Sequence, residues 1–306
     1  MKYFLIDGFN LAYRAHNANF ELKSASGLPS GMIYGFVRTV LSLKKKYRGY
    51  KFAVVWDKYS QEKRDIQPDY KAGRTSLAST VSAQVPDIKA CMQHMGMEQC
   101  EKEGYEADDL IATLAQAYVK DGSEHVIIYS NDKDFLQLVS TKVTVFKPKV
   151  GNSPEKFYDE EAVRELFGVP PQKLACFRSF DGDASDNITG VSRVPRKVLA
   201  SMVDRFETIE GVYKWLGEEK LTEYQRGAIL EAKERVTNNY KLIKLQTVPD
   251  VPCNPGAPDA KQAAEVLSKY DIKSIKPEDA IDLLGSSLNI RYTEPPPKLQ
   301  TISLFE

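Results

Sequence analysis

The chain has 306 residues, of which 42% are hydrophobic, and its 42 basic side chains balance 42 acidic ones. This length allows one large core or two smaller ones, and the balanced charge lacks the basic excess that marks many nucleic-acid-binding proteins. No apolar run has the length of a membrane span and no signal peptide precedes the first predicted strand, so we expect a cytoplasmic protein with no membrane partner.

The cysteines indicate a reducing compartment. Cys91, Cys100, Cys176 and Cys253 form no C-x-x-C pair and have no metal-ligand spacing. We therefore expect reduced and mostly buried thiols, as in a cytosolic protein.

Aspartates follow the predicted strands of the first half of the chain. Apolar runs at 3–6, 52–56 and 126–129 predict strands of an α/β sheet. The acids that follow them are Asp7, Asp57, Asp132 and Asp134. Because the carboxyl ends of parallel strands open onto one crevice, we expect these carboxylates to converge.

A further group of carboxylates opens a predicted helix. Glu106, Asp108 and Asp109 lie directly ahead of an apolar helical pattern that runs from Leu110 to Tyr118. A helix N-terminus stabilises one nearby acid, but not three. Taken alone, this stretch could be either a cation-binding cluster or a set of solvated acids at the start of a helix. Convergent carboxylates repel by about 4 kcal/mol per pair near a protein surface, so cations must neutralise them. An oxygen-only set without His or Cys suits magnesium, manganese or calcium rather than zinc.

The segments between these strands carry helices and one basic loop. A helix is predicted to follow Ser30 and to end at residues 44–46, three lysines that we expect to be solvated. The loop at 58–75 interleaves Tyr70 with basic residues, which suits contact with phosphates and bases, although an ordinary solvated loop is the alternative. Residues 76–84 are small and polar, so we expect a mobile segment outside the core.

The second half of the chain turns helical. The pattern predicts a strand at 143–146, a helix at 159–167, a helix from Pro170 that delivers Asp183 and Asp186, and a long amphipathic helix at 224–245. Asp183 and Asp186 are three residues apart and share a helix face. Asp181 does not lie on that face, and we expect it to be solvated.

Six blocks, taken together and in this order, resemble the 5′-nuclease family, which includes the nuclease domain of bacterial DNA polymerase I and the free-standing phage flap endonucleases. The blocks are Leu5-Ile6-Asp7-Gly8, Val54-Val55-Trp56-Asp57, Tyr70-Lys71-Ala72-Gly73-Arg74, Tyr105-Glu106-Ala107-Asp108-Asp109, Ser130-Asn131-Asp132-Lys133-Asp134 and Gly182-Asp183-Ala184-Ser185-Asp186-Asn187-Ile188. The resemblance covers roughly residues 1–245. It implies a PIN-like, mostly parallel sheet with flanking helices, which we place at 1–187, and a helix-hairpin-helix-like duplex-DNA-binding region, which we place at 188–292. The three prolines at 295–297 indicate a flexible tail at 293–306.

The same resemblance implies the site residues and their cofactor, a pair of Mg²⁺ ions that Mn²⁺ could replace. The first metal site would take Asp7, Asp57, Glu106 and Asp108, and the second would take Asp109, Asp132, Asp134, Asp183 and Asp186. Lys71 and Arg74 match basic residues that contact the scissile phosphate in the family, and Tyr70 and Arg64 are implied to contact the substrate.

The chain departs from the family after Ile188, where a glycine-rich hairpin normally holds a monovalent ion and a duplex phosphate through its backbone. Arg193 replaces a glycine here, and Pro195 lacks an N–H group. A K⁺ site is therefore weakened, and we expect Arg193, Arg196 and Lys197 to supply side-chain contacts to DNA instead.

The tail resembles the short peptides that dock on bacterial-type sliding clamps. Its anchor residues would be Gln300, Ile302, Leu304 and Phe305, behind a stiff spacer of three prolines. A frayed terminus is the alternative.

These inferences predict a metal-dependent 5′ nuclease that cuts DNA with a 5′ flap or 5′ end, and RNA primers in RNA–DNA hybrids, in a bacterial or phage-infected cell. Two alternatives remain open. One is a PIN-like ribonuclease, which normally lacks the block at 182–187. The other is a non-catalytic, clamp-tethered factor that binds branched DNA, against which the presence of all the acids argues.

Overall fold

The computed structural model describes residues 1–58, 60–71, 79–214, 216–218 and 220–285. The strands are β1 (Lys2–Asp7), β2 (Lys51–Val55), β3 (Glu98–Cys100), β4 (His125–Tyr129), β5 (Val143–Lys147), β6 (Lys156–Tyr158), β7 (Gly182–Asp183), β8 (Ile188–Thr189) and β9 (Cys253–Asn254). The α-helices are α1 (Gly8–Ala18), α2 (Gly31–Lys46), α3 (Gln61–Ile66), α4 (Ser79–Ser82), α5 (Gln84–His94), α6 (Ala107–Lys120), α7 (Glu160–Phe167), α8 (Pro171–Asp181), α9 (Arg196–Phe206), α10 (Ile209–Lys214), α11 (Glu223–Glu231), α12 (Lys233–Ile243), α13 (Ala260–Lys269) and α14 (Pro277–Gly285). Three short 3₁₀ helices are η1 (Asp134–Leu138), η2 (Ala184–Asp186) and η3 (Leu216–Glu218).

The chain forms two compact units that interleave in the sequence. Unit 1 comprises Met1–Lys58, Leu77–Val126 and Thr247–Glu306, and unit 2 comprises Tyr59–Ser76 and Ile127–Gln246. The strands run in the order β6-β5-β4-β1-β2-β3-β9, and β7 and β8 form a separate hairpin. The predicted α/β class with a mostly parallel sheet is confirmed.

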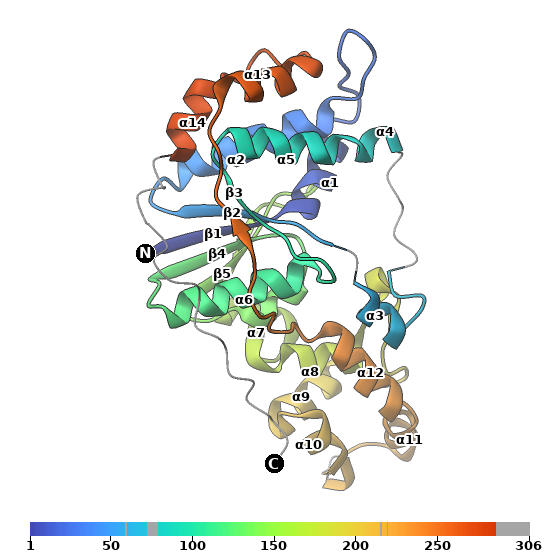
Figure 1. Cartoon of the computed structure of the whole chain (residues 1–306). Coiled ribbons are helices and arrows are strands. Elements are labelled where there is room, and N and C mark those ends of the chain that lie inside the picture. The colour runs from blue at the N-terminus through green and yellow to red at the C-terminus, as the bar shows by residue number, and fades with distance from the viewer. Residues whose placement is uncertain (59, 72–78, 215, 219, 286–306) are drawn as a thin grey trace. The chain divides into compact units, whose positions relative to one another are not determined.

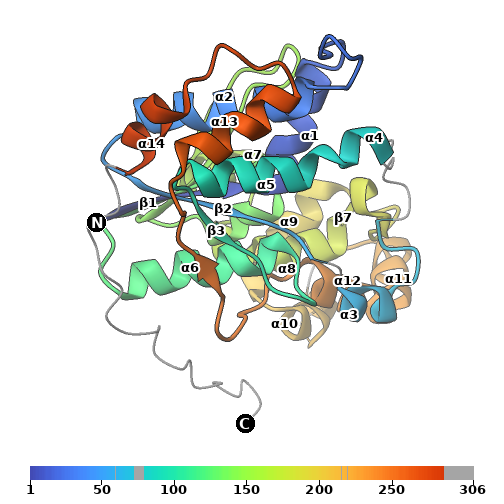
Figure 2. The ribbon, with the colours of Figure 1, turned by 45° about the horizontal axis from the view of Figure 1, so that its top comes forward.

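The parallel strands of unit 1 bring their carboxyl ends to one edge. Asp7 lies opposite Val55 in the β1–β2 pair, and Val55 lies opposite Cys100 in the β2–β3 pair. Helices α2, α5, α13 and α14 lie on one side of these strands and α6 lies on the other, as both views show (Figure 1 and Figure 2). The edge that carries Asp7 is therefore set on a sheet covered on both faces, as a parallel sheet requires.

The core of unit 1 packs around Trp56 at the end of β2. Its ring stacks on Phe36, with centroids 5.5 Å apart, and its Nε1 donates a hydrogen bond of 2.9 Å to Gln99. Gly8 lets α1 start against this ring, because a Cβ at that position would lie 2.6 Å from the indole. Close packing at Trp56 thus fixes the start of α1 directly beside Asp7.

In unit 2, helix α8 is the buried element. Every residue from Leu174 to Phe180 is buried, and Asn239 of α12 donates hydrogen bonds to the carbonyls of Ser179 and Thr189 at 2.9 and 3.0 Å. This amide fastens the end of α8 to the hairpin strand β8. In both views α3 lies beside α12 (Figure 1 and Figure 2).

Several local expectations are corrected. Cys100 and Cys253 form a disulfide between the antiparallel strands β3 and β9, whereas Cys91 and Cys176 are free and buried as expected. The sequence could not show that β9, some 153 residues along the chain, pairs with β3.

The lysines that end α2 are not all solvated. Lys44 is buried, its Nζ donates a hydrogen bond of 2.8 Å to the carbonyl of Tyr50, and it lies over the ring of Phe52. Burial lowers the pKa of Lys44 to about 8.

The segment at 76–84 lies partly outside the described residues, and its end is not loop. Residues 79–82 form α4, and Gln84 begins α5 in the core, where its Oε1 accepts a hydrogen bond of 3.1 Å from the backbone of Ile33. The predicted long helix at 224–245 is two helices, α11 and α12, that meet at Ala232.

Among the described residues, no helix combines the length and the hydropathy needed to cross a membrane.

Candidate functional site

The predicted metal ligands of unit 1 gather at the carboxyl edge of its strands. Asp7 ends β1 and caps α1, where its Oδ1 accepts a hydrogen bond of 3.1 Å from the backbone of Asn10. Asp57 follows β2, and its Oδ1 accepts a hydrogen bond of 3.0 Å from the backbone of Ala107, the first residue of α6. This bond ties the acid after β2 to the helix that carries the other three acids.

Helix α6 presents its acids at its N-terminus, as the sequence predicts. Glu106 is the N-cap residue and is half-buried, whereas Asp108 and Asp109 are buried in the first turn. The partial positive charge of a helix N-terminus stabilises carboxylates there. Because neighbouring carboxylates repel one another, this cluster favours a bound cation.

Unit 2 holds the remaining four acids, and an arginine lies among them. Arg178 of α8 is 3% exposed, and its two terminal nitrogens form ion pairs with Asp134 and Asp183. Asp132 also acts electrostatically on Arg178, so this guanidinium brings together acids that follow β4 and acids of the β7–β8 hairpin.

The local backbone holds these acids in place. Asp132 accepts a hydrogen bond of 2.8 Å from the backbone of Asp134, and Ser130 accepts one of 3.1 Å from the backbone of Asp132. Asp183 accepts hydrogen bonds from both the backbone and the hydroxyl of Ser185, at 2.9 and 2.6 Å. Local hydrogen bonds therefore orient the carboxylates of Asp132 and Asp183.

The ionisation of this cluster follows from its contacts. Burial acts against the charge of Arg178, but the charges of Asp134, Asp183 and Asp132 outweigh it and raise the pKa of the guanidinium. Burial likewise acts to raise the pKa of Asp183, but the bonds from Ser185 and the charge of Arg178 lower it overall. The carboxylate of Asp183 is thus held in its charged form.

The predicted substrate-contacting residues have different surroundings. Lys71 lies in the basic loop with a left-handed φ of 58°, and its backbone donates a hydrogen bond of 3.3 Å to the carbonyl of Asp186. This bond places Lys71 beside the predicted ligand Asp186. Arg64 lies exposed on α3, and Arg74 lies outside the described residues.

Tyr70, which the resemblance implies to contact the substrate, is buried in the structure. Tyr70 is 4% exposed and packs in a cluster with Ala175, Ile188 and Leu242, and the Lys71 ammonium lies 4.9 Å from the centre of its ring. A ring with this burial has no face for a base. The Tyr70 side chain instead packs the basic loop onto α8 and α12.

The hairpin residues at 190–195 keep the conformation of a tight turn despite the substitutions. Arg193 adopts a left-handed φ of 69°, which favours glycine, and its guanidinium lies 5.2 Å from the ring centre of Tyr224. Arg193 and Lys197 are exposed.

We expected the side chain of Arg196 to contact DNA, but in the structure it is bonded within the protein. Its Nε donates hydrogen bonds to both carboxylate oxygens of Asp181, at 3.2 and 3.0 Å. The guanidinium also lies 5.1 and 5.2 Å from the ring centres of Phe167 and Phe177. Asp181, expected to be solvated, is therefore the partner of Arg196.

Sequence reasoning missed Arg178 and Ser185. The signal for Arg178 was a single cation inside the otherwise apolar stretch from Leu174 to Phe180, and a buried cation needs buried anions. Ser185 lies inside a block that the resemblance quoted, but its hydrogen bond to Asp183 depends on the geometry of η2.

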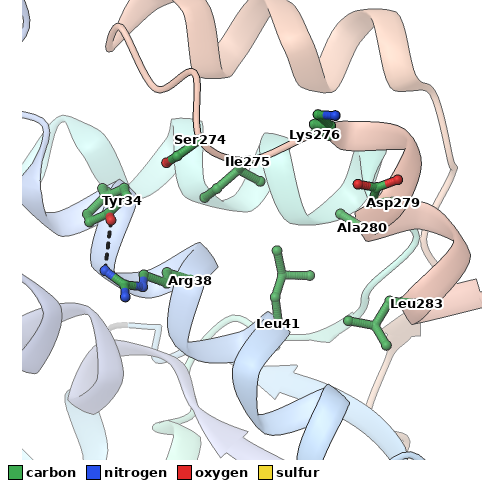
Figure 3. Close-up of a pocket in the computed structure, with 9 residues that line it drawn as sticks. All are labelled: Tyr34, Arg38, Leu41, Ser274, Ile275, Lys276, Asp279, Ala280 and Leu283. Carbon is green, nitrogen blue, oxygen red and sulfur yellow. Dashed lines mark hydrogen bonds between the residues drawn. The ribbon is translucent and has the colours of Figure 1, made fainter.

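A pocket of about 470 Å³ lies in unit 1, between α2 and α14. Leu41 and Leu283 point into it, and Arg38 at its rim donates a hydrogen bond of 2.8 Å to the hydroxyl of Tyr34 (Figure 3). None of the predicted site residues lines it. The predicted clamp-binding residues at 300–305 lie outside the described part of the chain.

Comparisons with known sequences identify close relatives. Residues 2–168 match the family model described as 5′-3′ exonuclease, N-terminal resolvase-like domain. A 5′-3′ exonuclease of Aquifex aeolicus is 34% identical over 282 residues, which cover 90% of this chain and 94% of that protein. DNA polymerase I of Bacillus subtilis is 33% identical over 244 residues, which cover 77% of this chain but 28% of the polymerase.

Comparisons with solved structures agree on the fold. T5 5′-exonuclease with bound zinc ions aligns with a TM-score of 0.66 and 19% identity, covering 94% of this chain and all of that one (100%). Flap endonuclease-1 from Methanococcus jannaschii aligns with a TM-score of 0.59 and 16% identity, covering 94% of this chain and 93% of that one.

Proposed function

Because the chain belongs to the 5′-3′ exonuclease family and is a nuclease, we propose that it hydrolyses phosphodiester bonds at 5′ flaps and 5′ ends of DNA with divalent metal ions held by its two groups of carboxylates. The observation that carries the proposal is the ordered carboxylate set at Asp7, Asp57 and the start of α6, fixed by the bond from Ala107 to Asp57. A non-catalytic DNA-binding factor would have no need of this set, and no relative above favours it.

The donor set fits magnesium or manganese. Each group offers carboxylate oxygens without a thiol or an imidazole, the ligand type that hard cations prefer. Asp7, Asp57, Glu106 and Asp108 would hold one ion, and Asp109, Asp132, Asp134, Asp183 and Asp186 would hold or support the other. Two such ions polarise the phosphate and lower the pKa of an attacking water.

The residues of the chain supply orientation and charge around those ions. The bonds from Asn10 to Asp7 and from Ala107 to Asp57 each orient one carboxylate oxygen. Lys71, beside Asp186, would donate to a non-bridging oxygen of the scissile phosphate, as would Arg74. Arg64 is exposed on α3 and would contact the sugar-phosphate backbone of the DNA strand.

Arg178 affects how a metal ion can bind to the carboxylates of unit 2. Its guanidinium pairs with Asp134 and Asp183, so in this arrangement it supplies the counter-charge that a metal ion would otherwise supply. We propose that Arg178 keeps these carboxylates ionised and in place until the cation arrives, and then remains beside the site.

The substrate class follows from the same family. We propose DNA with a 5′ flap or 5′ end as the main substrate and the RNA of an RNA–DNA hybrid as a further one, with Arg193 and Lys197 on the duplex. A hydrolysis assay on a flap that carries 5′ ribonucleotides tests the second part, and intact ribonucleotides beside cleaved DNA would contradict it.

We also propose that the tail binds a sliding clamp through Gln300, Ile302, Leu304 and Phe305. Two or three apolar anchors on an extended segment suit a groove. A chain that ends after residue 298 should lose clamp binding in a pull-down with a bacterial clamp and keep its nuclease activity; equal capture of both chains would contradict this.

The nuclease proposal is tested with end-labelled 5′-flap, blunt duplex and single-stranded DNA, with magnesium and with chelator. We expect magnesium-dependent cleavage near the flap junction. Asp108→Asn should abolish cleavage, and Asp121→Asn, at the far end of the same helix, should not. Tight binding without any cleavage by the parent chain would overturn the proposal.

A further inference from the structure

Two cysteines and a glutamate meet on one face of the sheet of unit 1. Cys100 of β3 lies directly opposite Cys253 of β9 in an antiparallel pair. Glu98 lies two residues before Cys100 in β3, so its side chain is on the same face of the strand. The two sulfurs and a carboxylate oxygen of Glu98 lie within 4.8 Å of one another. Three side chains that can ligate a metal ion therefore converge at this edge of the sheet.

The residue between the two β3 ligands shows which face they share. Gln99 points to the opposite face, where its Oε1 accepts a hydrogen bond of 2.9 Å from Nε1 of Trp56 in the core. Cys100 is fully buried, whereas Glu98 and Cys253 are half-buried. The group is therefore backed by the sheet and open to solvent at two of its three members.

A lysine on the neighbouring strand offsets negative charge at this group. Ala53 of β2 lies opposite Glu98, and Lys51, two residues earlier, is on the same face as that carboxylate. The charge of Glu98 acts to raise the pKa of Lys51, although burial lowers that pKa overall. A divalent cation with two thiolates and one carboxylate carries a single net negative charge, which the nearby ammonium would stabilise.

We propose that Glu98, Cys100 and Cys253 form a binding site for a thiophilic divalent cation of the zinc type when the Cys100–Cys253 bridge is reduced. A dithiol reductant supplies two electrons and two protons, so that the S–S bond breaks, two thiols form and the reductant becomes a disulfide. The binding cation then displaces the proton of each thiol into solvent. Thiolate ligands select zinc over magnesium and calcium, so this site differs in its metal from the carboxylate groups of the proposed nuclease.

The geometry suits a tetrahedral ion. With bonds of about 2.3 Å to sulfur and about 2.0–2.2 Å to oxygen, the ligand atoms of zinc lie roughly 3.5–3.8 Å apart. This spacing is within the 4.8 Å span of the group. β9 has two residues and is at the end of the strand order, so the sulfurs can separate by a shift of β9 that disturbs no strand beyond it. Water would take the fourth position, as in zinc sites with three protein ligands.

The cation would replace the bridge as the link between β3 and β9. The chain continues from β9 to α13, which packs against α5 of the same unit. A metal ion on Cys100 and Cys253 would hold the start of this segment on β3 after the covalent link is lost. The same pair of cysteines would then fasten β9 in both redox states.

Cobalt is the probe for the site, because thiolate ligands give Co²⁺ an intense near-ultraviolet charge-transfer band that carboxylate ligands do not give. The full chain is reduced with a dithiol, freed of reductant under nitrogen and titrated with Co²⁺, and the unreduced chain is titrated alongside. The variants are Cys253→Ser and Glu98→Gln. Their matched controls are Cys91→Ala, at a free buried cysteine, and Glu265→Gln, at an exposed glutamate of α13.

We expect a charge-transfer band that saturates at one cobalt ion per reduced chain, disappears when zinc is added and is absent from the unreduced chain. Cys253→Ser should abolish the band. Glu98→Gln should weaken cobalt binding by at least about tenfold, because loss of an outer-shell partner alone costs that much. Both controls should match the parent. Zinc should also raise the thermal midpoint of the reduced parent by more than that of Cys253→Ser.

A reduced parent without the band would overturn the inference, and this outcome does not depend on the folding of any variant. A band that persists in Cys253→Ser or disappears in Cys91→Ala would assign the thiolate elsewhere and overturn it as well. Parent-like cobalt affinity in Glu98→Gln would remove the carboxylate from the site and contradict the proposal. The nuclease function is judged separately by cleavage, since cobalt or zinc on its carboxylates gives no thiolate band.

Discussion

Arg178 is a buried cation held between Asp134 and Asp183. Removing one partner of such a group leaves uncompensated buried charges, at a cost of about 3–5 kcal/mol. We predict that Arg178→Ala lowers the free energy of unfolding by that order in chelator, and that excess magnesium restores much of it because the cation replaces the guanidinium. Urea unfolding with and without magnesium measures both values.

Arg196→Ala is the matched control for that experiment. The side chains of Arg196 and Asp181 are 48% and 24% exposed, so loss of this ion pair should cost less than about 1 kcal/mol and should not depend on magnesium. An Arg178→Ala loss that is the same in chelator and in magnesium would show that no cation competes for these carboxylates.

Lys44 gives the fold a pH dependence of known sign. Its pKa is lowered by burial from 10.5 to about 8 in the folded chain, so between these values the unfolded state binds more protons. The free energy of unfolding should therefore rise as pH increases from about 8 to about 10.5, by up to about 3 kcal/mol from this group.

Lys44→Met should remove that rise, and Lys45→Met, at the exposed neighbouring position, should keep it. Chemical unfolding at a series of pH values compares the three chains. A rise of the same size in Lys44→Met and in the parent would assign it to other groups.

At the scale of elements, the strand β9 is fastened to β3 by the Cys100–Cys253 disulfide. The bridge closes a sequence separation of 153 residues, which by loop-closure entropy stabilises the fold by about 5 kcal/mol. We predict that reductant lowers the thermal midpoint of the parent and leaves that of Cys253→Ser unchanged.

A thiol titration provides an independent reading of that bridge. Of the four cysteines two are free, so the denatured, unreduced chain should show two thiols and the reduced chain four. Four thiols before reduction would contradict the disulfide and return the cysteines to the reduced state that composition predicts.

The helices and parallel strands could largely be predicted, because each carries its own signal. Gly31–Lys46 has an apolar period over its whole length, and α7 begins after its cap Asp159 and ends at Gly168, which has a left-handed φ of 77°. The short antiparallel strands β6 and β9 could not, because two or three residues hold no period. Which strand each of them pairs with depends on the tertiary fold and not on its own residues.

At the scale of the whole molecule, the sequence singles out the acids as a set because most of them follow a strand or open a helix, and their assignment to metal ions stays a prediction. The contacts that give other residues their roles were not. Tyr70 is a core residue because the basic loop packs onto α8 and α12, and Arg178 joins the acids because α8 is buried. Both facts depend on long-range packing that no local pattern records.

The most direct test of the account is the initial rate of 5′-flap cleavage as a function of magnesium concentration, in the parent, in Asp57→Asn and in Asp183→Asn. Asparagine keeps the oxygen that accepts from Ala107 or from Ser185, so each variant removes one negative charge and retains that hydrogen bond. We predict a parent rate that rises more steeply than the first power of magnesium, and a loss of at least about a hundredfold in each variant. Cleavage that persists in chelator, or full activity in both variants, would contradict the assignment of these carboxylates to catalytic metal ions.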